Sequence, residues 1–228
     1  MQLRTGTAFD VDAVLLDMDG TLVDSTKVVV RLWRTWAARH GVDPEAILAM
    51  SHGRRGDDVL AEFAPPGVDQ VAELKWLAAR ELVERDGIVP VRGAARLLAA
   101  LPADRVAVVT SATRELTAVR MRAAALPVPQ VLVGADDVVR GKPHPEGYLR
   151  AAELLETDPA RCLVIEDASA GLEAGRAAGA RVIAVATTLS GDALDAWDWI
   201  PDLGSLRISD GAGARSTTAA PLCITIAR

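Results

Sequence analysis

Short runs of apolar residues alternate with longer stretches of helical periodicity along most of the chain. Continuous apolar runs are typical of strands that are buried on both faces of a parallel sheet. Strands that alternate with helices of this length form right-handed βαβ units. The pattern therefore predicts an α/β fold with a doubly wound parallel sheet. The strands are expected at VDAVLLD (11–17), RVAVVTS (105–111), QVLVGA (130–135), CLVIED (162–167) and RVIAVAT (181–187).

Between about Asp24 and Arg92 this alternation stops, and helical patterns follow one another without a convincing strand. The segment DPEAILAM is expected to form a helix capped by Asp43, with Pro44 in its first turn. We interpret the whole stretch as a helical cap inserted directly after the first strand. Aromatic residues dominate core burial, so the tryptophans of the insert are expected to form its own core. These tryptophans are Trp33, Trp36 and Trp76.

The end of the chain is less regular. SLRIS, which begins at Ser205, has the composition of a last strand, and the segment after it is rich in small residues. That segment is expected to be loosely ordered, with LCITI (222–226) as an alternative strand that pairs with a sheet edge. The predicted division is an α/β core of residues 1–23 and 93–209, a helical cap of residues 24–92 and a C-terminal tail of residues 210–228.

The composition narrows the range of possible functions. Of the 228 residues, 50% are hydrophobic and 25% are charged, which is typical of a soluble globular protein. The net charge of −6 and the lack of a basic stripe argue against nucleic-acid binding. No apolar run reaches membrane-spanning length and no signal peptide is recognisable, so we expect a cytoplasmic protein without a membrane partner. The cysteines, Cys162 and Cys223, are not expected to form a disulfide.

Polar residues gather where four of the predicted strands end. In an open α/β sheet, ligands bind at the carboxyl ends of the strands. Carboxylates that converge there need a cation between them, and Mg²⁺ prefers carboxylate oxygens, water and phosphate as ligands. A lysine and hydroxyl groups beside the metal would hold the other phosphate oxygens, so the set is suited to a phosphate ester. Its members are Asp17, Asp19 and Thr21; Thr110 and Ser111; Gly141, Lys142 and Pro143; and Glu166 and Asp167.

Four segments together resemble the motifs of the haloacid dehalogenase superfamily of phosphohydrolases. The resemblance covers nearly the whole chain, from about residue 10 to residue 209, and the insert matches the small helical cap of one subfamily. That subfamily includes phosphoglycolate phosphatase, sugar-phosphate phosphatases and β-phosphoglucomutase. The segments are DMDGTLVDS (17–25), VVTSAT (108–113), RGKPHPEGYL (140–149) and VIEDASAGLEAGRAAG (164–179).

The resemblance implies covalent catalysis at the first motif. Asp17 would be a metal ligand and the nucleophile that forms an aspartyl-phosphate. Asp19 would protonate the leaving oxygen and then act as the base that activates water, while its backbone carbonyl binds Mg²⁺. Thr21 would order the loop and take part in substrate binding. True dehalogenases of this superfamily lack the second aspartate, so its presence disfavours carbon–halogen cleavage.

The other motifs would supply ligands for the metal and for the phosphoryl group. Asp167 would bind Mg²⁺, and Glu166 would act there directly or through a water. Ser111, with Ala112 beside it, would bind the transferring phosphoryl oxygens, although a serine in this position taken alone is more often the N-cap of the following helix. Lys142 would neutralise the phosphoryl charge and help to hold the nucleophile. Phosphoryl transfer needs mainly positioning and charge stabilisation, which these groups would provide.

The insert is expected to recognise the leaving group of the substrate. Its loop SHGRRGDDVL (51–60) contains Arg54 and Arg55, and each is either an ordinary surface charge or a guanidinium that reaches the substrate. β-Phosphoglucomutases carry an arginine at the position of Gly56. The HGRR pattern is closer to polyol and sugar-phosphate phosphatases, but either arginine could substitute for the missing one.

We therefore predict a Mg²⁺-dependent phosphatase whose partner is a small phosphorylated metabolite, namely a sugar or polyol phosphate. A phosphosugar mutase of the β-phosphoglucomutase type and a phosphoglycolate phosphatase stay open as alternatives. A metabolite-binding protein that keeps the fold without catalysis is a third, but a binding module needs neither the nucleophile nor the acid. We expect a monomer, with a dimer left open.

Overall fold

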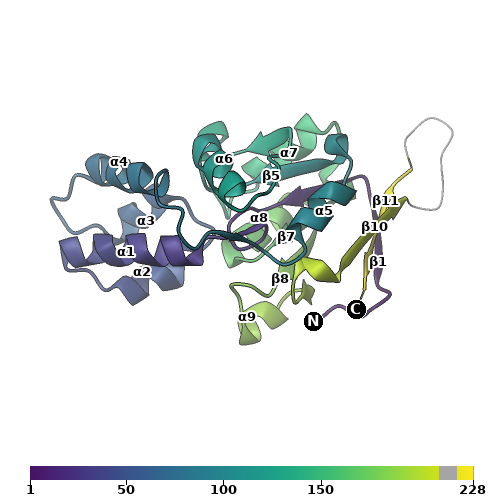
Figure 1. The fold of residues 1–228 in the computed structure, drawn as a ribbon, viewed down its shortest axis with the longest axis horizontal. Coiled ribbons are helices and arrows are strands. Elements are labelled where there is room, and N and C mark those ends of the chain that lie inside the picture. The colour runs from purple at the N-terminus through teal and green to yellow at the C-terminus, as the bar shows by residue number, and fades with distance from the viewer. Residues whose placement is uncertain (211–219, 228) are drawn as a thin grey trace.

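The computed structural model describes residues 1–210 and 220–227 of the protein. Within these residues, six parallel strands form a central sheet in the order β6-β5-β2-β7-β8-β9. Figure 1 labels β5, β7 and β8 of this sheet. The predicted doubly wound α/β fold is confirmed, and the short strand β9 is an addition that the apolar pattern did not reveal. The strands are β2 (Ala13–Leu16), β5 (Val106–Val109), β6 (Val131–Val133), β7 (Cys162–Glu166), β8 (Arg181–Val185) and β9 (Trp199–Ile200).

Helices cover both faces of this sheet, which explains why its strands are apolar throughout. In β2, Val14 and Leu16 contribute to one core cluster, whereas Ala13 and Leu15 contribute to another on the opposite face. The first cluster contains side chains of α5 and α6, and the second contains side chains of α7 and α8. The helices are α5 (Ala94–Ala100), α6 (Arg114–Ala123), α7 (Glu146–Leu154) and α8 (Ser169–Ala177), with the short α9 (Gly191–Asp195) further on.

The prediction of one strand over residues 11–17 is wrong, because the chain changes sheet at Asp12. The Asp12 carboxylate pairs with the Arg161 guanidinium at 2.7 Å, and its backbone N–H donates to the Arg161 carbonyl at 2.8 Å. The residues before it form β1 (Ala8–Val11), which pairs antiparallel with β11 (Leu222–Ile226), and β11 pairs in turn with β10 (Leu206–Asp210).

Both strands expected near the end of the chain are confirmed, SLRIS as β10 and LCITI as β11. β11 lies in the middle of a three-stranded antiparallel sheet, and Ile224 within it is fully buried in the core cluster that contains α5. Residues 222–226 pair as expected for LCITI, and their alternate side chains are buried. Residues 211–219 and 228 of the predicted tail lie outside the described residues. The described cysteines are both free, as expected.

The stretch after the first strand of the main sheet folds as helices that pack on one another. The prediction that Asp43 is the N-cap residue of α2 is confirmed, since its side chain accepts from the Glu45 N–H and Pro44 is the first residue of the helix. Trp33 and Trp36 belong to a separate apolar cluster, and the partly buried Trp76 packs against it. Figure 1 shows these helices to one side of the sheet. They are α1 (Thr26–His40), α2 (Pro44–Ser51), α3 (Gly56–Phe63) and α4 (Gln70–Glu81).

Two chain segments join this helical group to the rest of the molecule. They pair as β3 (Val23–Asp24) and β4 (Val89–Pro90), a short antiparallel ladder that the sequence analysis did not anticipate. None of the described helices combines the length and the apolar character that crossing a lipid bilayer would require.

Candidate active site

Asp17 follows the last residue of the central strand β2. Its backbone N–H donates to the carbonyl of Ile165 in β7 at 3.1 Å, which continues the pairing of the two strands by one residue. The residue is only 4% exposed. The pairing therefore holds its carboxylate at the carboxyl end of the sheet, where ligands bind in folds of this class.

Lys142 reaches Asp17 from the loop between β6 and α7. Its ammonium group donates to Asp17 Oδ1 at 2.5 Å, to Glu166 Oε1 at 2.7 Å and to the Val109 carbonyl at 3.1 Å. Burial alone would lower the pKa of Lys142, but the carboxylates of Asp17 and Glu166 outweigh it and raise that pKa well above its usual value. Lys142 is thus a fixed positive charge beside the Asp17 carboxylate.

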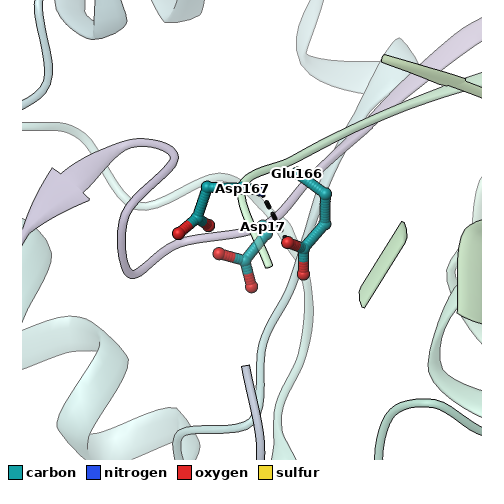
Figure 2. A group of neighbouring side chains, drawn as sticks. All are labelled: Asp17, Glu166 and Asp167. Atoms are coloured by element: carbon teal, nitrogen blue, oxygen red, sulfur yellow. Dashed lines mark hydrogen bonds between the residues drawn. The ribbon is translucent and has the colours of Figure 1, made fainter. Parts of the chain in front are cut away.

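Asp17, Glu166 and Asp167 form a buried acidic cluster (Figure 2). One ligand atom from each residue lies within 4.8 Å of the others. The second oxygen of Glu166 accepts the backbone N–H groups of Asp167 and Ala168, each at 2.7 Å. The predicted carboxylates of the first and last motifs therefore lie together, although Asp17 and Asp167 are 150 positions apart in the sequence.

The Asp167 carboxylate is held from two sides. Thr21 donates to Oδ1 at 3.0 Å, and the Thr188 hydroxyl donates to Oδ2. Gly20 passes so close that a Cβ there would lie 2.0 Å from Asp167 Oδ2, and its φ of +87° is in the left-handed region. This close approach explains the glycine of the DMDGT segment, because any side chain would collide with the carboxylate.

The electrostatics of the cluster fit a bound cation. Burial, followed by repulsion from the Glu166 carboxylate, raises the pKa of Asp17 well above its usual value and the pKa of Asp167 to about 7. Three carboxylates face one ammonium, so negative charge is in excess when all are ionised. A divalent cation with hard oxygen ligands, such as Mg²⁺, would balance that charge, and the donor set fits it.

The Asp19 side chain lies outside this cluster. Its predicted contact with the metal is through the backbone carbonyl and stays a prediction. Asp19 Oδ1 accepts the Ser25 hydroxyl at 2.6 Å, and its Oδ2 accepts an N–H of Arg120 at 2.5 Å. Neither partner of Asp19 is indicated by the sequence pattern. Arg120 lies in a helix with several arginines, including Arg114 and Arg122, and no local pattern distinguishes it from them.

Ser111 is held by the helical insert. Its hydroxyl donates to the Gly53 carbonyl at 2.8 Å, so the interpretation of Ser111 as a helix cap is wrong. Thr113 caps α6 instead, and accepts from the Leu116 N–H at 3.2 Å. Ala112, beside Ser111, is 8% exposed and its N–H donates to the Thr110 hydroxyl at 3.1 Å.

The two arginines of the insert loop have different surroundings. Arg54 donates to Glu62 at 2.7 Å and so stays within the insert. Arg55 reaches the Val139 carbonyl at 3.4 Å and packs on Gly141, where a Cβ would lie 2.8 Å from its Nε atom. Arg55 also pairs with Asp57 and Asp58 of the insert, each at 3.4 Å. It therefore contacts both the insert and the loop that carries Lys142, whereas Arg54 stays within the insert.

A cavity of about 550 Å³ lies between the sheet edge and the helical insert. Both predicted aspartates of the first motif and both loop arginines line it. The insert contributes apolar as well as polar side chains, including His52, whose pKa is lowered mainly by burial. Its lining includes Asp17, Asp19, Thr110, Ser111, Ala112 and Arg120 from the sheet side, and Trp33, His52, Arg54, Arg55, Leu77 and Glu81 from the insert.

Comparison with known proteins places this geometry among known enzymes. Residues 11–179 match the family model described as haloacid dehalogenase-like hydrolase. The chain is 44% identical over 175 residues to hexitol phosphatase A of Escherichia coli K12, covering 75% of this chain and 81% of that protein. It is 36% identical over 195 residues to glycerol-1-phosphate phosphohydrolase 2 of Saccharomyces cerevisiae, covering 81% of this chain and 78% of that protein.

A solved structure shares both the fold and recognisable sequence. It is that of a HAD family hydrolase from Deinococcus radiodurans R1, determined with bound phosphate and sodium. The superposition covers 80% of this chain and 85% of that one, with a TM-score of 0.58 and 34% sequence identity.

Proposed function

We propose that this chain, which belongs to the haloacid dehalogenase-like hydrolases and is a phosphatase, hydrolyses the phosphate monoesters of small sugars or polyols. The reaction would use Mg²⁺ and pass through an aspartyl-phosphate at Asp17. The contact of Lys142 with Asp17 inside the buried acidic cluster is the observation that carries the proposal. A purely structural ion pair would not need two further carboxylates beside it, because each adds repulsion.

In the first step, one oxygen of the Asp17 carboxylate attacks phosphorus while the bond from phosphorus to the ester oxygen breaks. Within the described residues Lys142 binds Oδ1 and nothing donates to Oδ2, so Oδ2 is the oxygen free to attack. Asp19 gives a proton to the departing alkoxide. The Ser111 hydroxyl and the Ala112 N–H would bind phosphoryl oxygens once they exchange their present partners, the Gly53 carbonyl and the Thr110 hydroxyl.

In the second step, Asp19 takes a proton from water, whose oxygen attacks phosphorus and releases Asp17 and inorganic phosphate. Lys142 keeps the negative charge of Asp17 balanced before and after transfer. Asp17, Asp167 and the backbone carbonyl of Asp19 would hold Mg²⁺, with Glu166 behind them. When bound, the metal would supply positive charge that stabilises the phosphoryl group in transfer.

The helical insert, residues 24–92, would act as a cap that selects the leaving group. Two observations support a sugar or polyol: the names of the relatives, which act on hexitol and glycerol phosphates, and the mixed lining of a cavity large enough for a small metabolite. Arg55 is the better candidate of the two loop arginines for substrate contact, because it reaches the loop that carries Lys142 in addition to pairing with Asp57 and Asp58, whereas Arg54 pairs at 2.7 Å with Glu62 of the insert. We propose that the enzyme acts in the cytoplasm and as a monomer.

The test is phosphate release from a panel of sugar, polyol, glycolate and nucleotide monophosphates, with Mg²⁺ and with a chelator. We expect release that needs the metal and favours sugar or polyol phosphates, and no release by the Asp17→Asn variant. Preference for phosphoglycolate would change the substrate class. Isomerisation of hexose 1-phosphate to hexose 6-phosphate with little free phosphate would replace hydrolysis by a mutase reaction. Metabolite binding without any turnover would contradict catalysis altogether.

A further inference from the structure

Arg120 lies almost entirely inside the protein at the boundary between the sheet and the cap. Its side chain is 4% exposed, and its guanidinium contacts two carboxylates. One terminal nitrogen donates to Asp19 Oδ2 at 2.5 Å and the other donates to Glu81 Oε1 at 2.8 Å. The first carboxylate belongs to the loop after β2, and the second is the last residue of α4 in the cap.

This arrangement joins three separate parts of the chain through a single side chain. The Asp19 and Glu81 side chains are 28% and 29% exposed, so each reaches the cavity that Arg120 also lines. Because a guanidinium presents its donors in a rigid fork, binding one carboxylate fixes the direction in which it can bind the other. If the cap shifted, Glu81 would move with it. The Arg120 guanidinium could then not keep its hydrogen bonds to Glu81 and to Asp19 in their present geometry.

Fold stability alone does not account for this residue well. The third nitrogen of the guanidinium, Nε, is buried without a hydrogen-bond partner in the described part of the chain. A buried ion pair of this kind is weak evidence for stability, because the cost of removing charges from water offsets their attraction. The two partners of Arg120 are an aspartate of the first motif and a cap residue, which points to a role in the reaction.

We propose that Arg120 is a positioning residue for Asp19, and that Glu81 makes this positioning depend on the cap. The inference rests on the proposed function, in which Asp19 gives a proton to the leaving oxygen. Arg120 and Ser25 hold the two oxygens of the Asp19 carboxylate, so its direction is set by groups outside the acidic cluster. Loss of Arg120 leaves Ser25 as the remaining partner of the Asp19 side chain among the residues described.

The experiment compares Arg120→Ala with Arg122→Ala, a change of an exposed arginine on the same helix. Two substrates are used, glycerol phosphate and 4-nitrophenyl phosphate, because nitrophenolate leaves without needing a proton. For Arg120→Ala we expect kcat on glycerol phosphate to fall about 100-fold, as for lost general acid catalysis. The initial burst of nitrophenolate should stay within about threefold of the wild type, since that step needs no acid. Arg122→Ala should leave both unchanged.

Chemical rescue separates positioning from a merely structural role. Millimolar guanidinium should restore part of the glycerol phosphate activity of Arg120→Ala, whereas urea, which has the same shape without the charge, should not. The inference would be overturned if Arg120→Ala lowered the nitrophenolate burst as much as kcat on glycerol phosphate. It would also be overturned if kcat on glycerol phosphate did not fall. If wild-type protein itself releases no phosphate from either substrate, the proposed function fails first, and that result is distinguishable from the others.

The link to the cap is tested with Glu81→Gln against Glu84→Gln, a change of a nearby carboxylate that pairs with Arg31. We expect Glu81→Gln to lower kcat on glycerol phosphate by about tenfold without affecting the nitrophenolate burst, in the same direction as Arg120→Ala but less. Glu84→Gln should have no effect. Equal effects of the two variants, or a Glu81→Gln variant with wild-type kcat, would show that cap position does not act through Arg120.

Discussion

Replacing Lys142 by methionine gives the most direct measure of how the active-site charges contribute to the fold. Methionine keeps most of the side-chain volume and removes the ammonium, so the change is mainly electrostatic. Lys142 is 7% exposed and is the cation that contacts both Asp17 and Glu166. The variant leaves these two buried carboxylates without their counter-ion.

The expected loss of stability is large for a single substitution. Removing one partner of a buried ion pair costs about 3–5 kcal/mol, because the remaining charge stays buried and unpaired. For a chain of this size, each kcal/mol corresponds to a shift of about 2–4 °C in Tm. The free energies therefore predict a Tm about 6–20 °C below that of the wild type near pH 8.

The loss should depend on pH. The pKa of Asp17 is already raised by burial, and removing the ammonium raises it further. A carboxyl whose folded pKa lies above its unfolded value stabilises the fold at low pH, and that contribution is lost as pH rises through the folded pKa. The raised pKa of Lys142 keeps the wild-type ammonium charged throughout this range. The variant should therefore approach wild-type stability near pH 5 and fall behind steadily towards pH 8.

Thermal or urea unfolding in the presence of chelator, at several pH values from 5 to 8, measures the effect without a metal that could replace the ammonium. Lys27→Met, at an exposed lysine, is the matched control and should change Tm little. A Lys142→Met variant that matches this control would refute the reasoning. So would a loss of stability that is the same at pH 5 and pH 8, because then the buried carboxylates would not be its cause.

Other expectations concern activity and metal binding. Asp17→Asn should abolish turnover and leave Tm equal or higher, because the variant lacks a buried carboxyl with a raised pKa. Steady-state kinetics and thermal unfolding curves check this, and retained activity would exclude the covalent step. Arg55→Ala should raise KM for sugar phosphates about tenfold, while Arg54→Ala should change KM little. Steady-state kinetics measure both variants, and equal effects on KM would contradict the prediction. Because the pKa of Asp167 is about 7, Mg²⁺ affinity measured by calorimetry should weaken about tenfold per pH unit below that value, with proton release; equal affinity at pH 6 and pH 8 would refute this.

Much of the core could be predicted from the sequence because burial leaves a local record. A strand covered by helices on both faces must be apolar at every position, as CLVIE is, and the polar residues that follow such strands then meet at one edge of the sheet. Asp17, Lys142, Glu166 and Asp167 are predicted to share one site on this ground. In the structure, Lys142 bonds to Asp17 and Glu166, and Asp167 belongs to the same acidic cluster. The positive φ of Gly20 fits a glycine in the DMDGT turn, while its close approach to the distant Asp167 is visible in the structure alone.

Only the tertiary structure decided where individual polar side chains turn. Asp12 divides an apolar run between two sheets because Arg161 lies opposite it, and Asp19 points to Arg120, which is 101 residues away in sequence. Arg54 and Arg55 are adjacent and identical in type, and both pair with carboxylates of the insert, yet Arg55 alone of the two also crosses to the loop of Lys142. Hydrophobic periodicity encodes which face of an element is buried. The partner of a charged side chain depends on how separate elements pack in space, and that information is not local to any segment of the chain.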